Sequence, residues 1–163
     1  MRVLFISPCP LDRKLGAPKV LIELAEAMRI EGCLCDLAGP EEMGASPSAH
    51  LENQHQLIEA TVRLIDNRAD EEDVIDYDVR FVPVERRRVP MSTLMVARSR
   101  LLPLHLDRLR IPRKPGLRGF AGRMLNFRRR IAHREMMRMT SETIAQADLV
   151  NVANHHDEQE VLR

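Results

Sequence analysis

Val3-Leu4-Phe5-Ile6-Ser7-Pro8-Cys9-Pro10 is the stretch of sequence that decides the fold. Its first four residues are apolar and include β-branched side chains, a pattern typical of a strand that is buried on both faces. The prolines that follow cannot donate hydrogen bonds to a neighbouring strand, so they end the run. We therefore predict a buried parallel strand over residues 3–6.

A helical pattern follows this strand. The apolar residues that are spaced as one helical face are Leu21, Leu24, Ala25 and Met28. Pro18 stands near the favoured first helical position, and Gly32 is a typical helix stop. Residues 33–38 are a second strand candidate, so this segment predicts a β-α-β unit with two parallel strands.

The rest of the chain alternates in the same way. Ser48 is placed to cap a helix whose apolar face is formed by Leu51, Ile58, Val62 and Ile65. Further strand candidates lie at 74–82, 93–97 and 149–153. Further helices are predicted at 98–109, where Pro103 should kink or divide the helix, from Arg123 onward, and at 154–162. Strands that alternate with helices predict an α/β fold, namely a Rossmann-like open sandwich with a mostly parallel sheet flanked by helices.

The composition suits one domain with a single core. The 163 residues are 44% hydrophobic and 30% charged, and a chain of this length buries roughly 70% of its unfolded surface. No run of about 18 apolar residues is present, and the apolar stretch at 3–6 is too short for a signal peptide, which favours a cytoplasmic protein. The three cysteines, Cys9, Cys33 and Cys35, are therefore expected to be reduced thiols.

The charges are divided unevenly along the chain. Residues 1–79 hold 16 acidic and 7 basic side chains, whereas residues 80–163 hold 8 acidic and 18 basic ones. A basic half predicts a surface for an anionic partner, unless an acidic face of the same molecule neutralises it. Nucleic acid is disfavoured as that partner, because single-strand binding needs aromatic stacking platforms and the chain has four Phe, one Tyr and no Trp.

The predicted helix after residue 123 concentrates this basic charge. Its arginines include Arg128, Arg129, Arg130, Arg134 and Arg138. A basic amphipathic helix can lie on an anionic membrane surface, which would place a cytoplasmic protein at the inner face of the membrane. A solvated helix face is the other interpretation. A non-catalytic α/β module that binds an anionic surface or partner is therefore one functional hypothesis.

The loop over residues 7–19 is the first place to look for chemistry, because parallel α/β sheets bind ligands beyond the carboxyl ends of their strands. The sequence has neither a G-x-G-x-x-G fingerprint nor a G-x-x-x-x-G-K-[ST] phosphate loop. Gly16 precedes a predicted helix whose free N–H groups can hold an anion such as a diphosphate. A plain turn residue is the alternative interpretation of Gly16.

Five segments form an ordered set of motifs along the chain: 1–8, 16–20, 24–32, 73–76 and 147–162. In this order and spacing, they resemble the N-terminal domain of family 4 glycosyltransferases of the GT-B fold. Segment 73–76 stands where that family has an Asp-Val-Val segment leading into its cleft, and 147–162 is similar to the last strand and helix of its N-terminal domain.

This resemblance implies an enzyme that moves a sugar from a nucleotide-sugar to an acceptor hydroxyl. Residues 1–163 would be a single acceptor-side domain, and the C-terminal domain that binds the nucleotide-sugar donor would be absent from this chain. The acceptor would be a sugar or a lipid-linked molecule. The family is usually metal-independent, so neither a metal nor a cofactor is expected, and the chain alone would be inactive.

The resemblance also implies candidate site residues. Gly16, Ala17 and Lys19 match the family's glycine loop and would bind substrate, although Leu15 replaces the first of the usual two glycines. Asp76 and Asp78 stand where the family often has histidines, and either carboxylate is a candidate catalytic base toward the acceptor hydroxyl. Acidic residues that flank a strand end are the alternative interpretation.

Arg98 and Ser99 are the last substrate-binding candidates. They follow the strand predicted at 93–97 and would lie at the edge of a cleft. There an arginine can bind the phosphate or carboxylate of an acceptor through two parallel hydrogen bonds.

Overall fold

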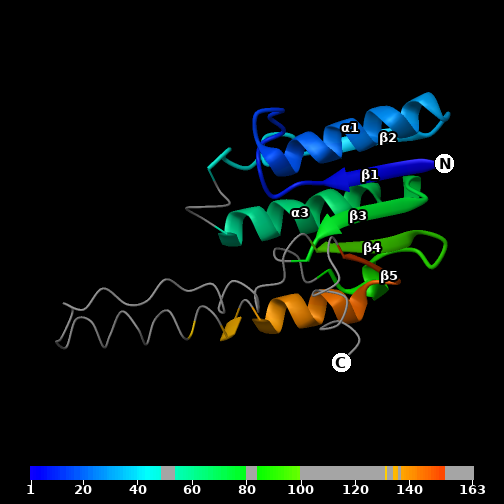
Figure 1. Cartoon of the computed structure of the whole chain (residues 1–163). Coiled ribbons are helices and arrows are strands. Elements are labelled where there is room, and N and C mark those ends of the chain that lie inside the picture. The colour runs from blue at the N-terminus through cyan, green and yellow to red at the C-terminus, as the bar shows by residue number, and fades with distance from the viewer. Residues whose placement is uncertain (49–53, 80–83, 100–130, 132–133, 136, 153–163) are drawn as a thin grey trace, which may run out of the picture.

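The computed structural model describes residues 1–48, 54–79, 84–99, 131, 134–135 and 137–152. Five strands form one sheet in the order β2-β1-β3-β4-β5, and every neighbouring pair is parallel (Figure 1). The bounds of the strands are β1 Arg2–Ile6, β2 Leu34–Ala38, β3 Val74–Asp78, β4 Leu94–Ser99 and β5 Leu149–Val152. The α/β fold with a parallel sheet is thereby confirmed.

Helices flank this sheet. Their bounds are α1 Gly16–Ile30, α3 Gln54–Arg68 and the short 3-10 helices Ala69–Glu71 and Arg86–Arg88, and residues 137–146 are also helical. The predictions for 100–130 and 154–162, and for Leu51 at the start of the second helix, lie outside the described residues.

Alternate strand residues divide the core between the two faces of the sheet. One core cluster joins β1 and β2 to α1 and consists of Val3, Phe5, Leu21, Ala25 and Cys35. On the other face, the even-numbered β1 residues Leu4 and Ile6 pack with Ile75 and Met95 against Ile65 of α3. Because strand side chains alternate, the residues of β3 and β4 between these core positions project toward the face that carries α1.

Helix α1 differs from its predicted form in two ways. It begins at Gly16, so Pro18 is its third residue, and Leu24 is 42% exposed rather than buried. Leu24 lies about 60° around the helix from Leu21, at the margin of the buried stripe that packs mainly against β1 and β2. The predicted stop is confirmed, because Gly32 has a φ of 86°, which favours glycine.

The buried face of α3 agrees only in part with the predicted one. Ile65 is fully buried as predicted, whereas Ile58 and Val62 are only partly buried. The other fully buried side chains of this helix are Leu57, Ala60 and Thr61. The hydroxyl of Thr61 donates to the Leu57 carbonyl at 2.8 Å, so this polar side chain satisfies itself inside the core.

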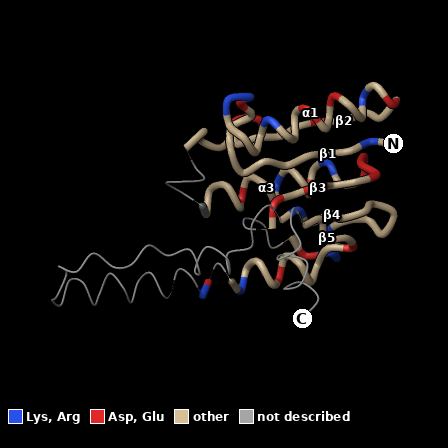
Figure 2. Tube along the Cα trace, viewed as in Figure 1, with Lys and Arg blue, Asp and Glu red and all other residues tan. Residues whose placement is uncertain are grey.

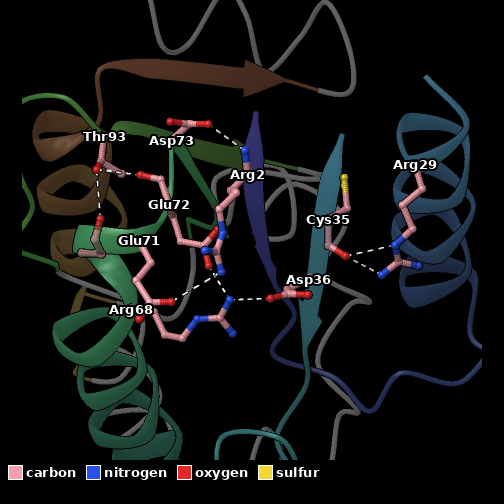
Figure 3. Close-up of polar contacts among 10 residues, drawn as sticks. Arg2, Arg29, Cys35, Asp36, Arg68, Glu71, Glu72, Asp73 and Thr93 are labelled. Carbon is pink, nitrogen blue, oxygen red and sulfur yellow. Dashed lines mark hydrogen bonds and ion pairs between the residues drawn. The ribbon is translucent and has the colours of Figure 1, made fainter. Parts of the chain in front are cut away.

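Polar contacts tie the amino ends of β1, β3 and β4 together (Figure 3). The backbone N–H of Arg2 donates to Asp73 Oδ2 at 2.7 Å, and its guanidinium contacts Glu71 at 3.4 Å. The Thr93 hydroxyl lies 3.0 Å from the Ala69 carbonyl oxygen and 2.8 Å from that of Glu72, and it can donate to either. Residues just before β3 therefore hold this strand in position beside both of its neighbours, β1 and β4.

Arg68, at the end of α3, also forms hydrogen bonds with residues of this region. Its Nη2 atom donates to both Asp36 on β2 and Glu72, and these hydrogen bonds raise the pKa of Arg68. The Glu72 side chain is 1% exposed, so Arg68 provides the charge that compensates its burial.

Arg29 covers part of the open edge of the sheet. β2 is an edge strand, and the Arg29 guanidinium donates through Nε, at 3.0 Å, and through Nη2 to the Cys35 carbonyl oxygen (Figure 3). Unpaired edge groups are templates for pairing with another chain, and a charged side chain across them opposes that pairing.

Replacing Arg29 with alanine should therefore make the protein self-associate through β2. Sedimentation velocity over a concentration series should show a growing dimer fraction for Arg29→Ala. Arg63→Ala is the control, because it removes an exposed arginine that lies on α3 instead of α1, and it should show no such growth. Identical sedimentation of both variants would contradict a protective role of Arg29.

Tyr77 gives a second prediction, because it is the only tyrosine and the chain has no tryptophan. Its side chain is fully buried, and this burial raises the pKa of Tyr77 far above the usual value of about 10. The folded state therefore keeps the proton that the unfolded state releases, so stability should decline as the pH rises above about 10.

Alkaline titration tests this expectation. The ultraviolet absorbance of tyrosinate should stay flat until the protein unfolds and then rise together with the loss of circular dichroism. Tyr77→Phe should lack this absorbance step and the part of the stability loss that comes from Tyr77. Ionisation of Tyr77 in the fully folded protein would contradict the expectation.

Candidate functional site

The strand order marks one place as the ligand-binding edge. β1 has β2 on one side and β3 on the other, and the order 2-1-3-4-5 reverses direction at the junction of β1 and β3. In open parallel sheets, ligands bind outside the carboxyl ends of the strands at such a junction. Figure 1 shows that α1 begins at this same end of the sheet.

Asp76 and Asp78 lie in the carboxyl half of β3. They alternate with the core residues Ile75 and Tyr77, so both project toward the face that carries α1. Both are buried, with 6% and 2% of the residue exposed. Figure 2 shows acidic residues near the carboxyl end of β3, on a strand that is otherwise uncharged.

Arg98 differs from its predicted position at a cleft edge after the strand. β4 extends to Ser99, so Arg98 is a strand residue, it stands opposite Asp78 in the register, and it is 8% exposed. Its Nη2 atom contacts Asp76 Oδ1 at 3.0 Å and donates to the Ile6 carbonyl oxygen at 3.1 Å. The guanidinium therefore reaches from β4 across β3 to the end of β1.

The other nitrogens of Arg98 carry N–H groups that are not used within the described part of the chain. Nε and Nη1 are both buried and have no hydrogen-bond partner there. Buried donors of this kind cost roughly 1–3 kcal/mol each when they stay unpaired. Unsatisfied groups in a native structure call for an explanation, and a missing ligand or water is one of the common ones.

Ser99 does not join this group. It is fully buried and alternates with Arg98 along β4, so it projects toward the opposite face of the sheet. Ser7, which the sequence did not single out, is fully buried at the start of the loop after β1. Its hydroxyl donates to the Cys9 carbonyl at 2.8 Å and accepts from the Cys9 N–H at 3.2 Å, so it stabilises the turn of this loop.

The start of α1 supplies backbone donors at the same end of the sheet. No side chain of the described residues caps this helix, and its first turn contains no acidic residue. A side chain added at Gly16 would meet nothing within 4 Å, so the space beside the first N–H groups, those of Gly16 and Ala17, is open. Lys19, in the same turn, lies 3.7 Å from Glu23 in an exposed ion pair.

Charged partners within the molecule engage several arginines of the basic half. These ion pairs are Arg86 with Asp148, Arg87 with Glu85, Arg88 with Asp66, Arg98 with Asp76, and Arg138 with Glu135 and Glu142. Arg128–Arg130 of the predicted membrane-binding cluster lie outside the described residues. Of these pairs, only Arg88–Asp66 and Arg98–Asp76 join the basic half to the acidic half, so they offset only a small part of the charge asymmetry.

The cysteines do not form a reactive pair. All three are free, as predicted, and Cys35 is buried in the cluster under α1. This burial raises the pKa of the Cys35 thiol, which disfavours the reactive thiolate.

Within the described ranges, no group of three or more His, Cys, Asp or Glu side chains is arranged to hold a metal ion. None of the helices in those same ranges has the length and apolar character needed to span a membrane. Compared with known protein families and with curated proteins, the sequence matches none.

The structure thus gathers Asp76, Asp78 and Arg98 on one face of the sheet. The α1 start with Gly16 lies at the same edge. The cross-strand contact of Arg98 with Ile6 spans 92 residues and has no local signal in the sequence. The sequence indicated only that polar residues stand at the ends of neighbouring strands.

Proposed function

We propose that this chain is the acceptor-side, N-terminal domain of a GT-B glycosyltransferase of family 4. The observation that carries the proposal is the placement of an uncapped helix start beside open space at Gly16, at the same sheet edge as the buried Asp76 and Arg98. The order of the parallel strands supports it, because the junction of β1 and β3 is where such sheets bind ligands.

The proposed chemistry divides between these two features. The free N–H groups of Gly16 and Ala17, together with the helix dipole, would stabilise the charge that develops on the departing diphosphate. Asp76 or Asp78 would accept the proton of the acceptor hydroxyl. The nucleotide-sugar donor would be held mainly by a second domain outside this chain, so the chain alone is expected to be inactive.

Substitution of Gly16 tests this assignment. The complete gene product, with any donor-binding domain encoded beside it, is assayed for nucleoside diphosphate released from a panel of nucleotide-sugars with sugar acceptors. Gly16→Leu should lower turnover about 100-fold, because its side chain blocks the N–H groups that face the diphosphate. The fold should persist, because the space around Gly16 is open.

Gly16→Ala is the matched control and should retain most of the turnover, because a methyl group leaves the approach to the helix start open. Equal circular dichroism of both variants would show that folding is intact. Unchanged turnover in Gly16→Leu would contradict the assignment. The alternative, a non-catalytic module on an anionic membrane, depends mainly on arginines outside the described residues, and binding to acidic vesicles without any transfer activity would favour it.

A further inference from the structure

We propose that Arg98 and Asp76 together bind neighbouring hydroxyl groups of an uncharged, polyhydroxylated ligand. The inference rests on the proposed function only where it identifies this ligand as the acceptor substrate. Its starting point is two buried nitrogen atoms of Arg98, Nε with one N–H group and Nη1 with two, which have no partner among the described residues. Two oxygen atoms of a ligand would give each of these nitrogens an acceptor.

The pattern of occupied atoms on Arg98 argues against a phosphate or carboxylate ligand. An oxyanion binds a guanidinium in a fork, along an edge that joins two nitrogens. The edge between Nε and Nη1 is blocked by the arginine's own Cδ. The two edges that remain open, Nε–Nη2 and Nη1–Nη2, both include Nη2. Nη2 already contacts the Ile6 carbonyl oxygen and Asp76. The two remaining donors therefore face different directions and suit two separate neutral oxygens.

The carboxylate beside Arg98 gives a second argument. Asp76 Oδ1 lies 3.0 Å from Nη2 of Arg98. An oxyanion that approached this guanidinium would also approach the Asp76 carboxylate, and the two like charges would repel each other. The Arg98 site should therefore exclude the phosphate group that the sequence predicted for it.

A hydroxyl group meets both requirements, because it accepts one hydrogen bond and donates another. Its oxygen can accept from Nε or Nη1 of Arg98 while its proton is donated to a carboxylate oxygen of Asp76. Two neighbouring hydroxyls can satisfy both donors, which a ligand with a single hydroxyl cannot do. This chemistry points to a sugar or cyclitol ring without a phosphate at the bound edge.

Nuclear magnetic resonance of the intact chain tests the inference directly. The Nε–H signal of Arg98 is identified in protein with ¹⁵N-labelled arginine by its absence from Arg98→Lys. Methyl glucoside, myo-inositol and inorganic phosphate are then titrated into the unmodified protein. At least one of the two polyols should shift the Arg98 signal saturably, and phosphate should not.

Variants extend the test. Arg98→Lys keeps the positive charge but lacks the two donors, so we expect polyol affinity to fall roughly 10-fold to 100-fold, as for the loss of hydrogen bonds from a charged donor. Arg87→Lys is the control, because Arg87 is 82% exposed and pairs with Glu85. Its polyol affinity should match that of the unmodified protein.

Three results would overturn the inference: no saturable shift with either polyol, a stronger response to phosphate, or equal affinity in Arg98→Lys. The outcome is separable from that of the proposed function. Polyol binding at Arg98 without sugar transfer by the complete gene product would support the inference and contradict the glycosyltransferase assignment. Transfer without any response of the Arg98 signal would do the reverse.

Discussion

Replacing Arg98 with methionine should lower the free energy of unfolding by about 3–5 kcal/mol. The Asp76 side chain is 9% exposed, and the substitution would leave its carboxylate buried without the guanidinium that contacts it at 3.0 Å. Methionine fills a similar apolar volume, so the loss would come mainly from removing the cation beside Asp76 rather than from a cavity, reduced by the cost of the unpaired Arg98 donors that the substitution also removes. Urea unfolding followed by circular dichroism measures the change.

A double variant separates charge from packing. Arg98→Met combined with Asp76→Leu should recover most of the stability, because well-packed apolar residues often replace a buried ion pair at little cost. If Arg98→Met alone were as stable as the unmodified protein, the ion pair would contribute nothing and Asp76 would be held by its other contacts.

The second large effect is expected at Arg68. Arg68→Met should lower the free energy of unfolding by about 2–4 kcal/mol, because Glu72 would lose its cation while its side chain stays buried. The estimate is below that for Arg98 because the Arg68 side chain is 28% exposed and solvent screens part of its charge.

Arg88→Met is the matched control for this prediction. Arg88 also pairs with an acidic residue of α3, Asp66, at 2.9 Å, but its side chain is 47% exposed. Exposed pairs contribute roughly 0–1 kcal/mol, so this variant should unfold almost like the unmodified protein. Equal losses for Arg68→Met and Arg88→Met would show that burial of Glu72 does not determine the effect.

Local patterns in the sequence predicted the architecture well. The apolar run at 3–6, the helix stop at Gly32 and the strand at 33–38 are each written within a few neighbouring residues, and each is present in the structure. The fold class followed because alternating strands and helices pack in few ways.

The errors occurred where polar residues are buried. The strand predicted at 93–97 stopped before Arg98 because an arginine is almost never buried without a partner, and that partner lies on another strand. The buried face of α3 includes Leu57 and Thr61, which the predicted face left out, and the Thr61 hydroxyl bonds to the Leu57 carbonyl. A sequence pattern does not show which polar groups find partners after folding.

The candidate site was predicted only in part. Asp78 ends β3 and Gly16 begins α1, as expected for residues near the carboxyl edge, whereas Asp76 is the middle residue of β3. The pairing of Arg98 with Asp76 depends on cross-strand register, and the orientation of Ser99 toward the other face depends on where β4 ends. Neither property is encoded in the local spacing of residues.

The hydrogen bond from Arg98 to the Ile6 carbonyl also has a consequence for the order of folding during synthesis. β1, α1 and β2 lie within the first 38 residues and can assemble as soon as they leave the ribosome, because their contacts are local in sequence. The contact with Arg98 spans 92 residues and requires β4 to be translated and docked. A nascent chain could therefore form the local contacts of the β-α-β unit before β4 is available to complete the Arg98–Asp76 site.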